Sequence, residues 1–238
     1  MQKTRPSYSK KRIFKRLDES TDIVRTVISK SFTSSEIDLI IRDTTKGVES
    51  LLPEVPFIGE KENFSLNDFF DAIMMLALFK ELKKRETTVR QIGQIMYEIR
   101  ELQAQESSKL YKFIYSKMLF SSFIKRSYKK NIKEMNEKAY SENWKMEFVE
   151  GDGEDFDWGV NFTDCAVHKF YKKHGGEELL PYVCMSDYAM FHELKNVEFS
   201  RTQTLSGGES YCDFRFRKGG STPRGWPPED LPDFKIEE

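Results

Sequence analysis

Three cysteines stand in the last third of the chain, and two of them are followed, three residues later, by a side chain that can carry a proton. In the segment NFTDCAVHKF, Cys165 and His168 have the spacing that places two side chains on one face of a helix. The segment CMSD repeats this spacing with Cys184 and Asp187, and the third cysteine is Cys212. Each pair could act as a thiol nucleophile with its proton partner, or as two ligands of a metal.

The cysteine spacings fit a structural role as well. None of them forms the Cys-x-x-Cys pair of a zinc ribbon, so the sequence predicts no full set of metal ligands and leaves a divalent metal open. Free cysteine is among the most buried residue types and often packs as a small hydrophobe. Spacing alone therefore leaves three roles open: nucleophile, metal ligand and core residue.

Composition narrows the class of protein. The 38 basic and 39 acidic residues nearly cancel, so the chain as a whole lacks the positive charge of a nucleic-acid binder. The most apolar run, residues 69–79, contains Asp71 and is shorter than the roughly 20 residues of a membrane helix. The basic start lacks the apolar stretch of a secretory signal, and the cysteine count is odd. We therefore expect a cytoplasmic protein with no nucleic-acid and no membrane partner, and leave a homo-oligomer open.

Apolar residues at three- and four-residue steps predict helices throughout the first half of the chain. Thr33 with Glu36, and Ser65 with Asp68, have the spacing of capping boxes at helix starts. We expect helices that end at Pro53, that cover 66–84 and 87–103, that run from Leu110 through Phe123, and that form an exposed connection over 125–140. Because the helices before Lys125 contain no cysteine or histidine, we expect them to serve packing or partner binding without catalytic groups.

The pattern changes after residue 140. Alternating and β-branched or aromatic segments predict strands, and glycine pairs mark turns between them. Strands are expected at 144–149, 156–162, 197–204 and 211–217, and helices at 164–174 and 177–194. The tail holds four prolines and is expected to run extended over the surface. The sequence thus predicts an α+β protein, with a helical region over 1–140 and an α+β domain over 141–238 that contains a small antiparallel sheet.

Three blocks of the second half resemble a known family. In order, NFTDCAVHKFYKKHG, LLPYVCMSDYAM and EFSRTQTLSGGESYCDFRF are similar to the C-terminal part of the L-2-amino-thiazoline-4-carboxylic acid hydrolases, over about residues 157–217. The resemblance implies hydrolysis of a C–N or C–S bond in a cyclic isothiourea or a related small molecule. The last block also resembles the end of the small-molecule-binding domain named after 4-vinyl reductases. A non-catalytic binding or sensory module is therefore the alternative, and a structural metal site comes behind it.

The family resemblance implies a cysteine-centred site. Its catalytic candidates are Cys165, Cys184, His168 and Asp187, and its substrate-binding candidates are Asn161, Arg201, Thr204, Cys212 and Asp213. A substrate carboxylate would need a cation such as Arg201, or the backbone N–H groups of the glycine turn. Two mechanisms stay open, a covalent thiol adduct and a metal-bound hydroxide.

Among the thiols, Cys165 is narrowly favoured as the nucleophile. It would lie in the first turn of its helix with His168 one turn later, whereas the carboxylate of Asp187 would raise the pKa of Cys184. We also expect at least two of the three sulfurs to lie within roughly 10 Å of each other around one cavity, because sites are concave and few.

Overall fold

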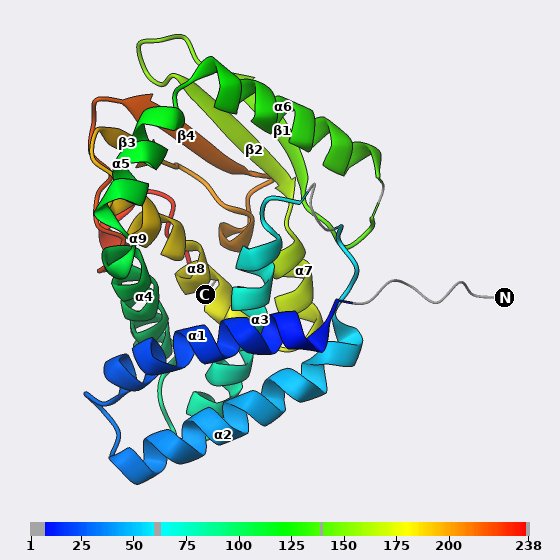
Figure 1. Cartoon of the computed structure of the whole chain (residues 1–238), viewed down its shortest axis with the longest axis vertical. Helices are drawn as coiled ribbons and strands as arrows, with labels where there is room; N and C mark the ends of the chain where they lie inside the picture. Colours follow the sequence, from blue (N-terminus) through cyan, green and yellow to red (C-terminus); the bar gives the residue numbers. More distant parts are fainter. Residues whose placement is uncertain (1–7, 60–62, 139, 237–238) are drawn as a thin grey trace, which may run out of the picture.

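The computed structural model describes residues 8–59, 63–138 and 140–236. It confirms the predicted α+β class: α1 to α6 precede a four-stranded antiparallel sheet with the strand order β1-β2-β4-β3, and α7 to α9 lie between β2 and β3 in the sequence. The sheet and α6 lie at one end of the molecule and α1 and α2 at the other, with α3, α7 and α8 between them (Figure 1). The helices are α1 (Lys10–Ile28), α2 (Ser34–Leu51), α3 (Leu66–Lys83), α4 (Val89–Glu106), α5 (Lys109–Met118), α6 (Ser122–Glu137), α7 (Ala166–Lys173), α8 (Leu180–Cys184) and α9 (Ser186–His192).

The predicted helices form, with one difference at a helix start and one predicted helix divided into two. Thr33 caps α2 through the expected box, in which its backbone N–H donates to the Glu36 carboxylate at 2.8 Å. Ser65 makes no such cap on α3. Helix α3 is instead fixed by burial, since apolar residues surround it and its central turns are buried on every side. The predicted helix from Leu110 through Phe123 is two helices, because α5 ends at Met118.

Helix α1 was not predicted. Its buried residues, among them Ile13, Leu17 and Val24, recur at three- and four-residue steps among many charged ones. This stripe packs against α2, α3 and α4. Because apolar residues are sparse in this segment, the sequence pattern did not indicate a helix there. Tertiary packing stabilises this helix. Within the described residues, no helix combines the length and the apolar character needed to cross a bilayer.

The sheet gives each strand one face toward the helices. The strands are β1 (Lys145–Glu150), β2 (Trp158–Asp164), β3 (Val197–Ser200) and β4 (Cys212–Lys218). Across β2 and β4, Phe162 lies opposite Cys212 and Val160 opposite Phe214, and Phe214 packs against Phe199 of β3. Because successive side chains alternate between faces, the residues between these pairs point to the other side of the sheet.

Helix α6 protects the edge strand β1. The Asn136 amide donates to the Met146 carbonyl at 2.8 Å and accepts from the Met146 backbone N–H at 3.3 Å. These bonds satisfy backbone groups that an open edge would expose. Helix α6 is therefore more than the exposed connection that was predicted, and Ile132 and Met135 on it are buried.

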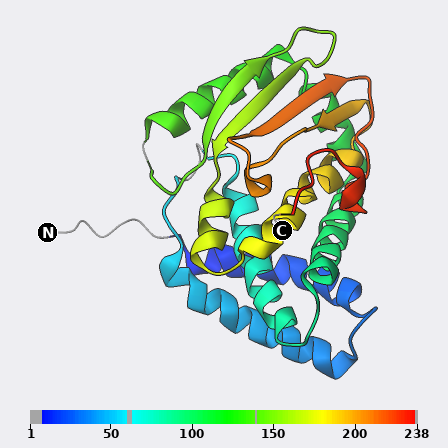
Figure 2. The same ribbon diagram turned by 180° about the vertical axis from the view of Figure 1, so that it is seen from behind.

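The C-terminal tail is not an extended surface segment, so that prediction was wrong. The tail returns across α8 and α9 (Figure 2), and Leu231 and Asp233 are buried. Phe234 packs against the Tyr182 ring at a centroid distance of 5.3 Å. Apart from a short 3-10 helix at Pro228–Asp230, the tail forms no helix or strand, but its apolar residues still pack against the core. Core residues from both sides of residue 140 form one cluster, and the division of the chain at that point stays a prediction.

Candidate active site

The three cysteines lie at the ends of three different elements. Cys165 is the residue before α7, Cys184 is the last residue of α8, and Cys212 is the first residue of β4. All three thiols are free. They are near enough to interact electrostatically, because the charge of Cys184 raises the pKa of both Cys165 and Cys212. The fold thus gathers three residues that the sequence spreads over three blocks.

Cys165 stands at a helix start, but its surroundings hold its thiol in the protonated form. Burial, the largest effect, raises its pKa to about 12, although the backbone N–H groups of His168 and Val167 and the Trp144 side chain lower it. At this thiol, burial therefore outweighs the helix N-terminus, and the role of Cys165 as nucleophile stays a prediction.

Cys184 combines a polar thiol contact with two charged neighbours. Its Sγ lies 3.3 Å from Ser206 Oγ. Burial raises the pKa of this thiol, while Arg201 and the Ser206 hydrogen bond lower it and Asp187 raises it again. Cys184 is half-buried, so part of its surface faces water.

The guanidinium of Arg201 connects Cys184 and Asp187 through hydrogen bonds. Its side chain is only 1% exposed, and its Nε donates to Asp233 at 2.5 Å. Its Nη1 donates to Asp187 at 2.8 Å, and its Nη2 donates to the Cys184 carbonyl at 3.0 Å. Tyr188 completes the network by donating to the second oxygen of Asp233 at 2.9 Å. A guanidinium with these partners holds Cys184 and Asp187 in place and has no free face for a substrate carboxylate.

The segment after Arg201 is held in place beside β4 by hydrogen bonds to Asp213, Thr204 and Cys212. Asp213 accepts from the Thr202 and Gln203 backbone N–H groups at 2.9 Å each and from the Thr202 hydroxyl at 2.7 Å. Thr204 is buried and accepts from the Gly207 N–H at 3.1 Å. The Cys212 sulfur accepts from the Leu205 N–H at 3.2 Å. These residues shape the loop that carries Ser206 to the Cys184 thiol.

Backbone donors of the glycine turn bond within the turn at two successive residues. The N–H of Gly208, which has a left-handed backbone at φ 83°, donates to the Leu205 carbonyl at 3.3 Å. The next N–H, of Glu209, donates to the Thr204 carbonyl at 3.2 Å. These two N–H groups are therefore not available to a substrate carboxylate.

The structure does not bring every predicted residue to the thiols. Asn161 and Asp213 face each other across β2 and β4 on the side of the sheet away from Cys212. The Asn161 side chain accepts from Arg215 at 2.9 Å there. His168 lies on α7, and its contribution at Cys165 is the backbone N–H described above.

Asp187 and Asp68 carry partly exposed carboxyls that sequence patterns did not group together. The Asp187 side chain is 35% exposed and that of Asp68 is 56% exposed. Burial is nevertheless the largest effect on both carboxyls and raises the pKa of each. Asp68 and Arg100 both act electrostatically on Asp187, and we call the region of these three side chains the recess.

Helices from the first half of the chain contribute further polar groups to this region. Arg100 of α4 donates to Asp68 at 3.1 Å and to Asp71 at 3.1 Å. Tyr115 of α5 and Tyr128 of α6 are close enough to Asp68 that its charge raises the pKa of both phenols, after the larger effect of burial. The first half therefore supplies charged groups at the recess. A signal existed at Asp68, but its spacing from Ser65 suggested a cap.

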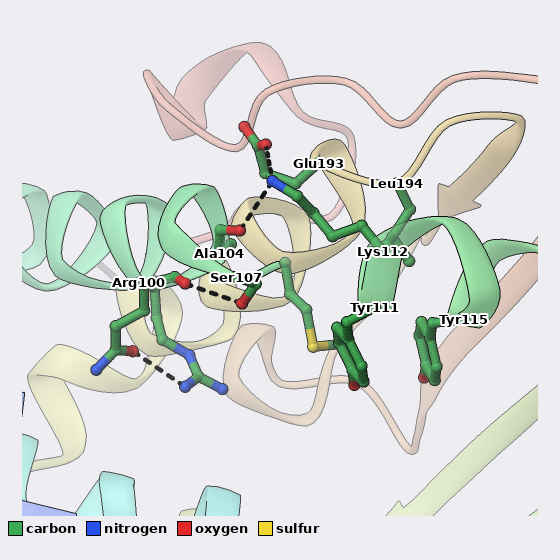
Figure 3. A pocket seen from close by; sticks show the side chains of 10 residues that line it. Arg100, Ala104, Ser107, Tyr111, Lys112, Tyr115, Glu193 and Leu194 are labelled. Carbon is green, nitrogen blue, oxygen red and sulfur yellow. Dashed lines mark hydrogen bonds and ion pairs between the residues drawn. The ribbon is translucent and has the colours of Figure 1, made fainter. Parts of the chain in front are cut away.

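A cleft of about 160 Å³ lies between the end of α4, α5 and α9. Arg100 and Tyr115 are among the residues that line this cleft (Figure 3). Lys112 crosses the cleft and pairs with Glu193 at 2.9 Å. The thiols are not among its lining residues. Within the described part of the chain, no group of three or more histidine, cysteine or acidic side chains is arranged to hold a metal ion.

Comparison with known proteins identifies the family. The model of the L-2-amino-thiazoline-4-carboxylic acid hydrolase family matches residues 67–216, from the first turn of α3 to the end of β4. This is more than half of the chain, and it includes Asp68, Arg100 and all three cysteines. The chain therefore belongs to this family. Neither a search of curated proteins nor a search of solved structures gives a match.

Proposed function

We propose that the protein is a hydrolase that opens a C–N or C–S bond of a cyclic isothiourea, with Cys184 as nucleophile and Asp187 as proton acceptor. The observation that carries this proposal is the buried guanidinium of Arg201, which binds the Cys184 carbonyl and the Asp187 carboxylate together. Membership of the hydrolase family supports the class of reaction.

The electrophile would be the ring carbon between sulfur and nitrogen, which carries the exocyclic amine. Asp187 takes the thiol proton as the Cys184 sulfur adds to this carbon, and returns it to the ring atom that leaves. Water then adds to the same carbon, gives a proton through Asp187 to the sulfur, and releases Cys184. A carboxylate with a raised pKa is a better proton acceptor than an ordinary one, which suits Asp187 to this task.

This proposal gives Cys184 the role that the sequence narrowly favoured for Cys165. A protonated nucleophile needs a nearby base, and Asp187 lies on the element that follows Cys184. Cys165 remains at the site as a thiol whose helix N-terminus would stabilise charge that develops on the substrate. We assign substrate binding to Asp68 for the exocyclic amine and to Arg100 for the carboxylate, because both are partly exposed in the recess.

Steady-state hydrolysis of 2-aminothiazoline-4-carboxylate by the whole chain tests the proposal. We expect Cys184→Ser to lower kcat by at least about 10³-fold, since a hydroxyl is a much weaker nucleophile than a thiol without further activation. Cys212→Ser is the matched control and should keep kcat within about tenfold, because that sulfur accepts a structural hydrogen bond. Full activity of Cys184→Ser would refute the assignment.

A second function is favoured by the protonation of the thiols. Burial raises the pKa of all three, as expected for a pocket that binds a small molecule without reacting with it. Under this alternative, calorimetry would detect binding of the thiazoline while no product forms at any pH. Turnover by the wild-type chain that is lost in Cys184→Ser would exclude it.

A further inference from the structure

An apolar surface on α5 and the start of α6 is turned away from the core. Its members are Leu110, Tyr111, Phe113, Ile114, Met118 and Phe123, and their exposed fractions range from 41% for Met118 to 71% for Phe123. We call these six side chains the α5 surface. Along α5, Leu110, Phe113, Ile114 and Met118 recur at three- and four-residue steps, so they form a single stripe.

The orientation of α5 is fixed from its other side. Ser116 on α5 and Leu119 just after it are buried, and the Lys112 ammonium is tied to Glu193 and to the Ala104 carbonyl at 3.2 Å (Figure 3). The helix therefore cannot roll its apolar stripe inward without breaking these contacts. Because a stripe of this kind normally faces the core, an exposed one marks an interaction surface.

The positive charge around the α5 surface indicates which kind of partner this surface binds. From Ser107 to Lys133 the sequence holds eight basic residues and no acidic one: Lys109, Lys112, Lys117, Lys125, Arg126, Lys129, Lys130 and Lys133. Lys109, Lys117 and Arg126 are exposed, and the Lys117 ammonium lies 5.8 Å from the centre of the Phe113 ring. Four of the eight pair with acidic residues from outside this segment: Lys112 with Glu193, Lys129 with Glu150, Lys130 with Glu134 and Lys133 with Glu137. The exposed Lys109, Lys117 and Arg126 therefore carry the local positive charge.

We propose that the α5 surface docks the protein on an anionic lipid bilayer, lying in the headgroup region without crossing it. A convex helix with aromatic and aliphatic side chains on its outer face, flanked by lysines, fits the boundary between headgroups and acyl chains. Attraction of the lysines to anionic lipid adds to the burial of the apolar side chains. This partner differs from the sequence expectation, which considered net charge and spanning segments.

A second copy of the chain fits the surface less well. Two α5 surfaces that met face to face would bring their basic segments together, and like charges at an interface are unfavourable. A protein partner would need an acidic groove that receives a convex ridge. Charge complementarity therefore favours the bilayer, and the test below separates these occupants.

Vesicle flotation with the purified whole chain tests the proposal. We expect binding to phosphatidylcholine vesicles that contain about 30% phosphatidylserine, and much weaker binding to phosphatidylcholine alone. Raising the salt from about 0.1 M to about 0.5 M should weaken the binding, since exposed charges are screened. Binding that ignores lipid charge, or no binding to either vesicle, would overturn the proposal.

Variants locate the binding surface. Phe113→Ser with Phe123→Ser should reduce partitioning at least about tenfold, because both rings lose apolar burial. Lys109→Gln, Lys117→Gln and Arg126→Gln together should reduce it on the order of 100-fold, at about fivefold per basic residue. Leu39→Ser is the matched control, since Leu39 is 42% exposed on α2, and it should bind like wild type.

Gel filtration of the same variants addresses the other occupants. The proposal expects the wild type and the Phe113→Ser, Phe123→Ser variant to elute alike. A wild-type dimer that this variant converts to a monomer, with no vesicle binding by either, would assign the surface to a second copy. Vesicle binding that all variants retain would place the lipid contact elsewhere. Either result contradicts the α5 surface as a bilayer contact.

Discussion

The loop after β3 and the recess contain similar polar residues, but these residues differ in their hydrogen bonding and in their exposure to water. In the loop, Asp213 accepts three hydrogen bonds and Thr204 holds the turn from a buried position. In the recess, Asp68 and Asp187 keep water-accessible surface, although burial raises the pKa of both. Saturated groups fix a structure, whereas groups with spare hydrogen-bonding capacity can bind or react. The comparison assigns positioning to the loop and chemistry to the recess.

Removal of the Arg201 guanidinium, which connects the loop and the recess, should have the largest effect on stability. Arg201→Met leaves Asp233 buried without its ion-pair partner, and we expect the free energy of unfolding to fall by about 3–5 kcal/mol. Denaturant titration followed by circular dichroism measures this loss. Arg217→Met is the control, because its pair with Glu198 lies at the surface and contributes less than about 1 kcal/mol. Equal stability of the two variants would contradict the role of Arg201.

Substitution of the recess carboxyl of Asp187 should lower activity and leave stability nearly unchanged. We expect Asp187→Asn to lower kcat about 100-fold, since the thiol loses its proton acceptor. Its stability at neutral pH should be unchanged or slightly higher. The pKa of Asp187 is raised in the folded state, so its contribution to stability is present below the unfolded pKa and lost as pH rises through the folded pKa. A large loss of stability in Asp187→Asn would assign this residue to the scaffold.

The pH dependence of kcat/KM tests the role of Asp187 as proton acceptor. Because the base form of Asp187 is needed, kcat/KM should rise with pH through a pKa above its ordinary value of 3.8. This acid limb should be absent from the residual activity of Asp187→Asn. Initial rates from about pH 3.5 to about pH 9 measure both profiles. A limb that persists unchanged in the variant would mean that another group titrates there.

Arg100 should affect binding more than turnover. If it holds the substrate carboxylate equally in the ground and transition states, Arg100→Gln raises KM about tenfold and leaves kcat within about twofold. Asp71 keeps its ion pair with Arg16 in this variant, so the fold should persist. A fall in kcat with unchanged KM would remove Arg100 from substrate binding.

The smallest effect is expected in the loop. Thr204→Val removes the side-chain acceptor for the Gly207 N–H and leaves the Thr204 carbonyl as its other acceptor, and loss of such a cap costs about 1 kcal/mol. Activity should fall slightly, since the Ser206 hydroxyl near Cys184 also lies 3.1 Å from the Thr204 hydroxyl. Thermal melting and steady-state rates measure the two effects. An unchanged melting temperature would show that the turn does not depend on this side chain.

The sequence predicted elements better than it predicted partners. Periodic apolar residues located most helices and strands, because local pattern determines them. Asp233 could not be assigned, since its proline-rich segment has no periodicity and only the folded chain brings it to Arg201. Asp68 and Arg100 lie far from the cysteines in sequence and reach Asp187 through helix packing. Cys165 met the spacing rule for a reactive thiol, but that rule contains no information about burial.

Mass spectrometry of the covalent intermediate tests the central claim most directly. The wild-type chain would be mixed with excess 2-aminothiazoline-4-carboxylate, quenched in acid during turnover and digested, so that any covalent intermediate is trapped. The account predicts an adduct of substrate mass on the peptide that contains Cys184, absent from Cys184→Ser treated in the same way. An adduct on Cys165 in its place, or wild-type turnover by Cys184→Ser, would contradict it.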